Sequence, residues 1–262
     1  MRIATWNVNS IRSRIDRVTA WLQRSDVDVL AIQETKCKEE QFPLEPLTAL
    51  GYEVAHHGLS QWNGVAVVSR VGLEDVSVGF AGQPGFGDPL ADEARAIGAT
   101  CGGVRTWSFY VPNGRTLDDP HYAYKLDWFA RLRQTAGGWL ADDPRAQIAL
   151  MGDWNVAPHD DDVWDINAFD GHTHVSGPER EAFAGVVDAG FADVVRPYTP
   201  GPGVYTFWDY QRLRFPKREG MRIDFVLASN ALAARVSGAS IDREERKGKG
   251  PSDHAPVIVD LD

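Results

Sequence analysis

The stretch Ile148-Ala-Leu-Met-Gly-Asp-Trp-Asn-Val-Ala-Pro158 decides the fold, because it joins a buried strand to two polar side chains. The apolar run from Ile148 to Met151 predicts a strand that stops at Gly152. Alternate side chains of an extended chain share a face, so Asp153 and Asn155 point the same way. A carboxylate and a carboxamide at a strand end suit a bound water or an oxyanion. The alternative is an ordinary turn, in which Asp and Asn are common.

The composition is that of an ordinary globular protein, with 43% hydrophobic and 24% charged residues in a chain of 262. This length fits one large domain or two small ones. The chain passes from Met1 directly into a strand-like pattern, and no apolar run reaches the roughly 18 residues of a membrane span. We therefore expect a cytoplasmic protein without membrane association. Cys37 and Cys101 form neither a metal-type pair nor a disulfide framework, so free thiols are expected.

The formal net charge of -10 argues at first against a nucleic-acid partner, because affinity for phosphates comes from Lys and Arg. Local clustering matters more than the total, and one short stretch carries five cations and a single acid. These cations are Arg212, Arg214, Lys217, Arg218 and Arg222. Some of the acidic residues are expected to form a metal site, whose bound cation would offset their charge.

Alternating and apolar patterns predict strands along most of the chain, and helical spacing predicts three helices between them. The strands are expected at residues 2–8, 27–32, 52–57, 64–69, 95–101, 104–111, 148–151, 221–227 and 257–261. The helices are expected at residues 11–22, 122–140 and 178–189, the first with Ser10 as its N-cap. Gly102-Gly103 predicts a hairpin turn. Residues 204–210 are expected to be an aromatic strand segment.

Several of these strands end in polar side chains. Asn7 and Glu34 end the first two strands, Tyr110 ends the strand before Pro112, and Asp253-His254 precedes the last strand. For Glu34 a solvated loop is the alternative, and for Tyr110 a core phenol with one hydrogen bond.

Other polar residues have simpler interpretations. Asp224 lies among apolar neighbours and needs a partner, because an unpaired buried charge is costly. The acidic run from Asp160 to Asp170 is expected to be a solvated loop. His172 and His174 have the spacing of metal ligands, but no cysteine or third histidine lies near them, so a metal role is disfavoured.

Residues 204–210 contain four aromatics and lead directly into the basic cluster, a combination typical of a nucleic-acid groove. Alternation places Thr206, Trp208 and Tyr210 on one face and Tyr205, Phe207 and Asp209 on the other, so one set packs inward. We expect the rings of Phe207 and Trp208 to be offered to the minor groove. A core tryptophan is the alternative.

Five motifs in order resemble the exonuclease III family of abasic-site endonucleases and span the chain from end to end. They are Thr5-Trp6-Asn7-Val8-Asn9, Gln33-Glu34-Thr35-Lys36, Gly152-Asp153-Trp154-Asn155-Val156-Ala157-Pro158, Arg222-Ile223-Asp224 and Ser252-Asp253-His254-Ala255-Pro256. The resemblance implies an α/β fold, a four-layer sandwich of two mixed β-sheets packed face to face and flanked by helices. It also implies a single domain over residues 1–262, because Asn7 and Asp253 would meet in one site.

The resemblance further implies roles for individual residues. Glu34 would be the principal metal carboxylate. The other residues around the ion would be Asn7, Asp153, Asn155, Asp253 and His254. The catalytic residues would be Tyr110, Asp153, Asn155, Asp224 and His254, with His254 paired to Asp224. DNA would be contacted by Phe207, Trp208, Arg212, Arg214, Lys217 and Arg218. Asp153 would serve either as the base for water or as the acid for the leaving 3′ oxygen, and the sequence leaves both open.

The implied function is metal-dependent hydrolysis of the phosphodiester 5′ to an abasic site, with 3′-5′ exonuclease and 3′ phosphodiesterase or phosphatase activity. Mg²⁺ is the expected cofactor, with Mn²⁺ as a substitute, since oxygen ligands suit hard cations. The expected partner is double-stranded DNA with abasic or 3′-blocked sites, acted on by a monomer at the nucleoid. The alternatives are a phosphoesterase of the same fold that acts on a lipid or inositol phosphate, and a catalytically silent DNA-binding scaffold.

Overall fold

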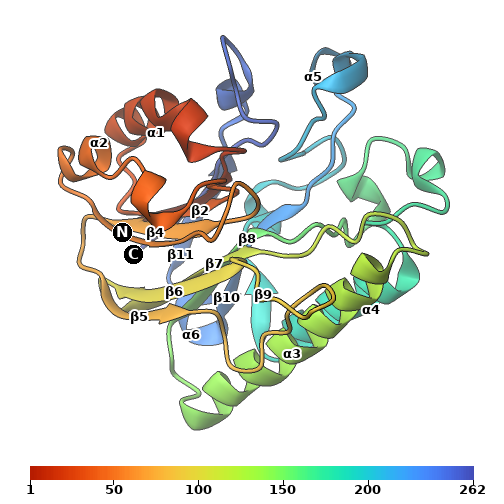
Figure 1. The fold of residues 1–262 in the computed structure, drawn as a ribbon, viewed down its shortest axis with the longest axis horizontal. Coiled ribbons are helices and arrows are strands. Elements are labelled where there is room, and N and C mark those ends of the chain that lie inside the picture. The colour runs from red at the N-terminus through yellow and green to blue at the C-terminus, as the bar shows by residue number, and fades with distance from the viewer.

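Two six-stranded β-sheets pack face to face, and helices cover their outer faces (Figure 1). The computed structural model describes residues 1–262. The first sheet has the strand order β11-β12-β1-β2-β4-β3. Its strands are β1 (Arg2–Asn7), β2 (Val29–Gln33), β3 (Glu53–His57), β4 (Val65–Ser69), β11 (Val236–Ile241) and β12 (Val257–Leu261). The sheet is mixed, because β1 pairs parallel with β2 and antiparallel with β12.

The second sheet has the order β5-β6-β7-β8-β10-β9 and is also mixed, with β7 and β8 parallel and β8 and β10 antiparallel. Its strands are β5 (Glu74–Val78), β6 (Ala96–Cys101), β7 (Val104–Tyr110), β8 (Ile148–Asp153), β9 (Phe191–Asp193) and β10 (Asp224–Ser229). β8 is thus the predicted strand of the opening motif and lies centrally in its sheet. The predicted fold class, two mixed sheets flanked by helices, is confirmed.

Three apolar clusters hold these layers together. Small and β-branched side chains such as Val29, Val67 and Ala149 fill the space between the two sheets. The outer face of the first sheet packs on α1 (Ile11–Ser25) and α2 (Glu45–Thr48), and that of the second on α3 (Pro120–Asp142) and α4 (Gly177–Asp188). Two short helices, α5 (Arg214–Lys217) and α6 (Asn230–Ala233), lie in connections.

Helix α1 follows the predicted pattern. Ile11, Val18, Trp21 and Leu22 are buried at helical spacing against the first sheet. The arginines of the helix are exposed or half-buried, and two of them donate to carbonyl oxygens of the segment 245–251. Ser10 is the N-cap as expected, since its hydroxyl accepts a hydrogen bond from the Ser13 amide. This helix therefore begins directly after β1 and fixes the path of the chain beyond Asn7.

Residues 204–210 do not form the predicted strand. Only Phe207 makes β-bridges, one with Met221 and one with His254, and β10 begins at Asp224 rather than at 221. The prediction of a fully solvated acidic loop is also wrong for Asp162. Its carboxylate is completely buried and receives ion pairs from Arg222 and Arg196. Sequence composition did not reveal this pair, because the two partners lie 60 residues apart.

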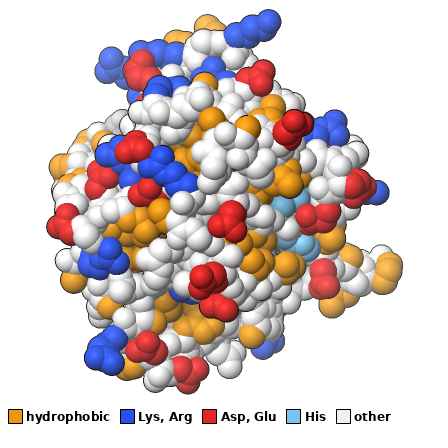
Figure 2. All heavy atoms as spheres, turned by 90° about the vertical axis from the view of Figure 1, so that its left-hand side faces the viewer, with side chains coloured by type: hydrophobic (Ala, Val, Ile, Leu, Met, Phe, Trp, Pro, Cys, Tyr) orange, Lys and Arg blue, Asp and Glu red, His pale blue; other side chains and the backbone are white.

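The two chain ends lie side by side, and the Met1 amino group donates a hydrogen bond to the Leu261 carbonyl oxygen at 2.7 Å (Figure 1). None of the helices is long and apolar enough to cross a membrane. Acidic and basic side chains are interspersed over the face shown in Figure 2. Basic side chains gather at its top, the end of the molecule at which α5 lies in Figure 1.

Candidate active site

The strand ends of both sheets meet at a cleft of about 400 Å³. Asn7 ends β1 and Glu34 follows β2, while Tyr110 and Asp153 end the parallel strands β7 and β8. Because parallel strands finish at the same edge of a sheet, these side chains reach one place. The cleft is lined by Glu34, Tyr110, Asp153, Asn155, Asp253 and His254 among others. The structure thus brings together residues that are almost 250 positions apart.

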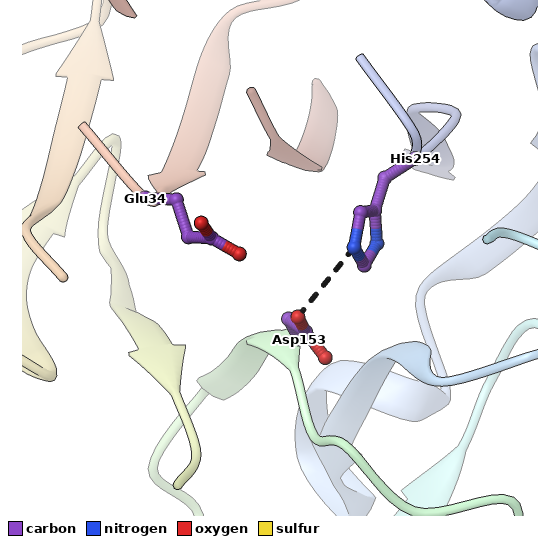
Figure 3. Close-up of side chains that lie close together, drawn as sticks. All are labelled: Glu34, Asp153 and His254. Carbon is purple, nitrogen blue, oxygen red and sulfur yellow. Dashed lines mark ion pairs between the residues drawn. The ribbon is translucent and has the colours of Figure 1, made fainter. Parts of the chain in front are cut away.

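Glu34, Asp153 and His254 form the centre of the site (Figure 3). Their ligand atoms lie within 4.8 Å of one another, and the side chains point toward a common space. Asn7 joins the two carboxylates, since its Nδ2 donates to Glu34 Oε1 at 2.8 Å and to Asp153 Oδ2 at 3.0 Å. The Asn7 Oδ1 atom accepts a hydrogen bond from the Asn9 amide. In this conformation Asn7 therefore orients the carboxylates through its nitrogen, and its oxygen is engaged elsewhere.

His254 is held between two aspartates. Its Nδ1 lies 2.8 Å from Asp224 Oδ2, and its Nε2 lies 3.7 Å from Asp153 Oδ2. Burial alone would lower the pKa of His254, but the charges of Asp224 and Asp153 outweigh it and raise the pKa to about 10. The imidazole is therefore a cation at neutral pH, and Asp224 has the partner that its buried position requires.

The two carboxylates of the centre have opposite pKa shifts. Burial raises the pKa of Asp153 to about 7, although His254 partly opposes the shift. For Glu34, burial also acts to raise the pKa, but Lys36 and Asn7 outweigh it and leave the pKa below its ordinary value. Glu34 is thus an anion at neutral pH, while Asp153 is poised to exchange a proton, as a general acid or base must be.

Asn155 lies beside this centre in a compact amide cluster. It adopts a left-handed backbone (φ 51°), and its Nδ2 donates to the Val111 carbonyl oxygen. Its Oδ1 lies 3.1 Å from both Asn113 Nδ2 and His174 Nε2. Burial lowers the pKa of His174 to about 3, so the ring is neutral, and as the Nε2-protonated tautomer it donates to Asn155 Oδ1. The structure therefore gives His174 a hydrogen-bonding position in the cleft.

A buried ion pair supports this cluster from behind. The Lys125 ammonium donates to the Asn155 carbonyl oxygen at 2.7 Å and to that of Asn113 at 3.1 Å. It also pairs with Glu179, and both side chains are fully buried. Burial lowers the pKa of Lys125, while Lys125 outweighs burial at Glu179 and keeps the pKa of that carboxyl low. Helices α3 and α4 thereby fix the backbone on which Asn155 and Asn113 are mounted.

The donor set fits a hard divalent cation. Glu34, Asp153 and Asp253 offer carboxylate oxygens to one cleft, and oxygen ligands are those that Mg²⁺ prefers. The four carboxyl groups of Glu34, Asp153, Asp224 and Asp253 outnumber the two cationic side chains, Lys36 and His254, and a bound cation would offset the difference. Such an ion would be held by Glu34, Asp153 and Asp253. His254 is already engaged by two aspartates, so the structure favours a hydrogen-bonding role over metal ligation for it.

The predicted DNA-contacting residues lie in different environments: some line the cleft or are exposed, and others are buried. Phe207 is half-buried and lines the cleft, with its ring 4.9 Å from that of His254. Arg212, Lys217 and Arg218 are exposed on the segment 209–219, hereafter the basic loop, and half-buried Arg214 pairs there with Glu219. The side chains of Arg212 and Arg218 extend from left-handed backbone positions.

The prediction for Trp208 is wrong. Its side chain is only 1% exposed and packs against Tyr205, Phe215 and Ala255, so the ring cannot reach a DNA groove. Arg222 is likewise no part of a phosphate-binding surface. It is buried, pairs with Asp162 and Asp193, and stacks over Phe225. The alternation argument failed for Trp208 because residues 204–210 are not a regular strand.

Sequence reasoning missed several residues around the cleft. Asn113 and Arg115 follow β7 in a loop that gave no periodic signal, and Arg115 is exposed at the rim. Phe169 reaches the cleft from the acidic segment. The only available hint was the Pro-Asn-Gly turn after Tyr110, because turn asparagines often bond to nearby backbone.

Buried carboxylates, an imidazolium and a flanking basic loop define a hydrolase of phosphate esters. The chain belongs to the endonuclease/exonuclease/phosphatase family, whose model matches residues 4–254. It is 29% identical to exodeoxyribonuclease III of Haemophilus influenzae, with 100% of both chains covered. An AP endonuclease structure from Archaeoglobus fulgidus is 36% identical, with a TM-score of 0.93 and coverage of 100% of this chain and 99% of that one.

A third relative is a 3′ phosphatase from Neisseria, whose structure contains a product DNA hairpin. It is also 36% identical, with a TM-score of 0.93 and coverage of 100% of this chain and 99% of that one. The recognised resemblance to exonuclease III nucleases is therefore confirmed. The chain is a phosphodiesterase nuclease of this family, and metal dependence is general among its members.

Proposed function

We propose that the protein is a DNA repair nuclease that hydrolyses the phosphodiester 5′ to an abasic site and also removes blocking groups from 3′ ends. The observation that carries the proposal is the cluster of Glu34, Asp153 and His254 in a cleft whose lining also includes Arg115 and Asp209, the first residue of the basic loop. The similarity to both an AP endonuclease and a 3′ phosphatase supports these two activities.

Each group in the cleft has a task in this reaction. Mg²⁺, or Mn²⁺ in its place, would polarise the phosphate and assist formation of the nucleophile. Asp153, with its pKa of about 7, exchanges a proton with the water or the leaving 3′ oxygen. The His254 imidazolium stabilises negative charge that develops on the phosphate, and Asp224 holds it in place. Tyr110 and Asn155 bind phosphate oxygens from the cleft wall.

DNA is expected to lie across the cleft, with its backbone against the basic loop. Arg212, Lys217 and Arg218 supply the phosphate contacts. Phe207 lines the cleft beside His254 and contacts the sugar at the damaged position. We also propose that residues 1–262 act as one domain, since the site takes residues from both ends of this range, and that the protein acts as a monomer.

A direct incision assay tests the proposed function. The protein is incubated with Mg²⁺ and a duplex that carries one abasic site, beside an undamaged duplex and a duplex with a 3′ phosphate. We expect a nick 5′ to the abasic site and release of phosphate from the 3′ end, both abolished by EDTA. Hydrolysis of a lipid or inositol phosphodiester in preference to DNA would assign the protein to the alternative branch of the fold. No hydrolysis of any substrate would favour a silent DNA-binding scaffold.

A further inference from the structure

The basic loop is joined directly to the segment that carries Asp253 and His254. The Trp208 amide donates to the Asp253 carbonyl oxygen at 2.9 Å, and the Ala255 amide donates to the Thr206 carbonyl oxygen at 2.7 Å. The base of the loop and this segment therefore form one backbone unit. A group that fixes the loop can also influence the Asp253 carboxylate.

Tyr210 makes a second, side-chain connection at the start of the loop. The residue is 50% exposed, but its hydroxyl is engaged in hydrogen bonds. The hydroxyl donates to the Pro251 carbonyl oxygen at 2.8 Å and accepts from Arg14 Nη2 at 3.0 Å and Asn9 Nδ2 at 3.4 Å. A single phenol thus links helix α1, the segment before β12 and the turn that joins β1 to α1.

Asn9 carries this connection to both sides of the candidate metal centre. Its Nδ2 donates to Asp253 Oδ1 at 3.1 Å, and its Oδ1 accepts from Lys36 Nζ at 2.5 Å. The same Lys36 ammonium lies 2.6 Å from Glu34 Oε2. Asn9 therefore lies between the two carboxylates, which come from opposite ends of the sequence. It has a left-handed backbone (φ 45°) that directs its side chain between them.

We propose that Tyr210 and Asn9 are positioning residues, which hold Asp253 and Lys36 in register for cation binding and tie the basic loop to the metal centre. The inference rests on the proposed function, because it assumes that the Glu34 and Asp253 carboxylates receive a cation. Neither residue has to touch the reacting phosphate. Their effect is on where Asp253 lies before a cation arrives, since a preorganised carboxylate binds more tightly than a mobile one.

The test is calorimetry of Mn²⁺ binding to the DNA-free protein, with Tyr210→Phe and Asn9→Gly. Phenylalanine removes only the hydroxyl, and glycine tolerates the left-handed backbone of position 9. Tyr198→Phe is the matched control, because Tyr198 is also exposed (44%) and its hydroxyl also donates to a backbone carbonyl oxygen, that of Val236 at 3.0 Å. Val236 pairs with Leu261, at the end of the sheet away from His254.

We expect Tyr210→Phe and Asn9→Gly each to weaken Mn²⁺ binding about fivefold, the order of one lost hydrogen bond, while Tyr198→Phe leaves it unchanged. The double variant should be little weaker than Asn9→Gly alone, and the melting temperature of Tyr210→Phe should stay close to that of the wild type. Equal Mn²⁺ affinity in Tyr210→Phe and the wild type, or no binding by either, would overturn the inference. Weaker binding in the variants of a protein that fails to cut DNA would instead refute the proposed function and leave the inference standing.

Discussion

The Nδ1 atom of His254 lies 2.8 Å from Oδ2 of Asp224, and both side chains are almost completely enclosed. Asp224 begins β10 opposite Asp153 at the end of β8, so the antiparallel register places both aspartates next to one histidine. Burial of an imidazolium is unfavourable by itself, yet two neighbouring carboxylates reverse the balance. The positive charge of His254 therefore depends on the register in which β8 and β10 pair.

This arrangement predicts how stability depends on pH in the metal-free protein. The folded pKa of His254, about 10, lies above the value of 6.5 for an ordinary histidine, so folding favours its protonated form. Its contribution to stability is fully present below pH 6.5 and is lost as the pH rises toward 10. Urea unfolding at pH 6.5, 8 and 10 should show this loss, and Asp224→Asn should reduce it. An imidazole signal of His254 that titrates near pH 6.5 in NMR would contradict the assignment.

Glu34→Gln is expected to weaken binding of Mg²⁺ or Mn²⁺ by an order of magnitude or more. The substitution keeps the shape and removes the anion that Lys36 and Asn7 maintain in the cleft. Calorimetry on both forms measures the change, and Glu39→Gln serves as a control at an exposed glutamate nearby in sequence. Equal affinity in wild type and Glu34→Gln would show that Glu34 is only a strand-end residue.

Asp153→Asn and His254→Ala should each lower turnover on abasic DNA by orders of magnitude without unfolding the protein. About 1.4 kcal/mol of lost transition-state stabilisation corresponds to one factor of ten. Because the two side chains serve one step, the turnover of the double variant should be only slightly lower than that of the less active single variant. Single-turnover rates measure the loss of activity, and circular dichroism shows whether the variants remain folded. Full activity in either single variant would remove that residue from the mechanism.

Trp208→Ala is expected mainly to lower stability, whereas Phe207→Ala is expected mainly to weaken DNA binding. Removal of the buried Trp208 ring should lower the free energy of unfolding by about 3 to 5 kcal/mol, because truncation leaves a cavity. Phe207 lines the cleft, so its removal should mainly weaken binding to abasic duplexes, with a smaller effect on intact ones. Thermal melting and duplex binding in Ca²⁺ separate the two effects. The same loss of affinity on both duplexes would leave damage recognition without a role for Phe207.

Lys125→Met should destabilise the protein by about 3 to 5 kcal/mol, since Glu179 would be left as an unpaired buried charge. The variant also loses the bonds to the Asn155 and Asn113 carbonyl oxygens, so turnover should fall. Adding Glu179→Gln removes the stranded charge and should restore part of the stability. Urea denaturation measures the stability of the single and the double variant. A change below about 1 kcal/mol would mean that water reaches this pair.

The sequence predicted the parts of the molecule that depend on local pattern. Buried strands such as Ile148–Asp153 and the amphipathic helix α1 follow from periodicity, and β8 was the most informative of them. These elements require only neighbours in sequence. The positions of Glu34 and Asp153 at strand ends were also visible in the pattern, whereas their roles in one site were implied by the resemblance to the exonuclease III family.

The remaining features depend on contacts between distant segments. Arg222 and Asp162 neutralise each other although composition assigned one to a DNA surface and the other to a solvated loop. Trp208 is buried because Phe215, farther along the basic loop, folds back over it. No periodicity marks Lys125 as a buried cation, since its partner Glu179 lies on another helix.

The position of Asn7 and His254 in the chain has a consequence for synthesis. Strand β1 leaves the ribosome long before β12 does, and the two strands can pair only after both have been made. Long-range contacts predominate throughout the fold, so folding is expected to be slow. A growing chain therefore contains Glu34 and Asp153 well before it contains His254. A nascent chain that ends before His254 lacks the imidazolium of the candidate active site.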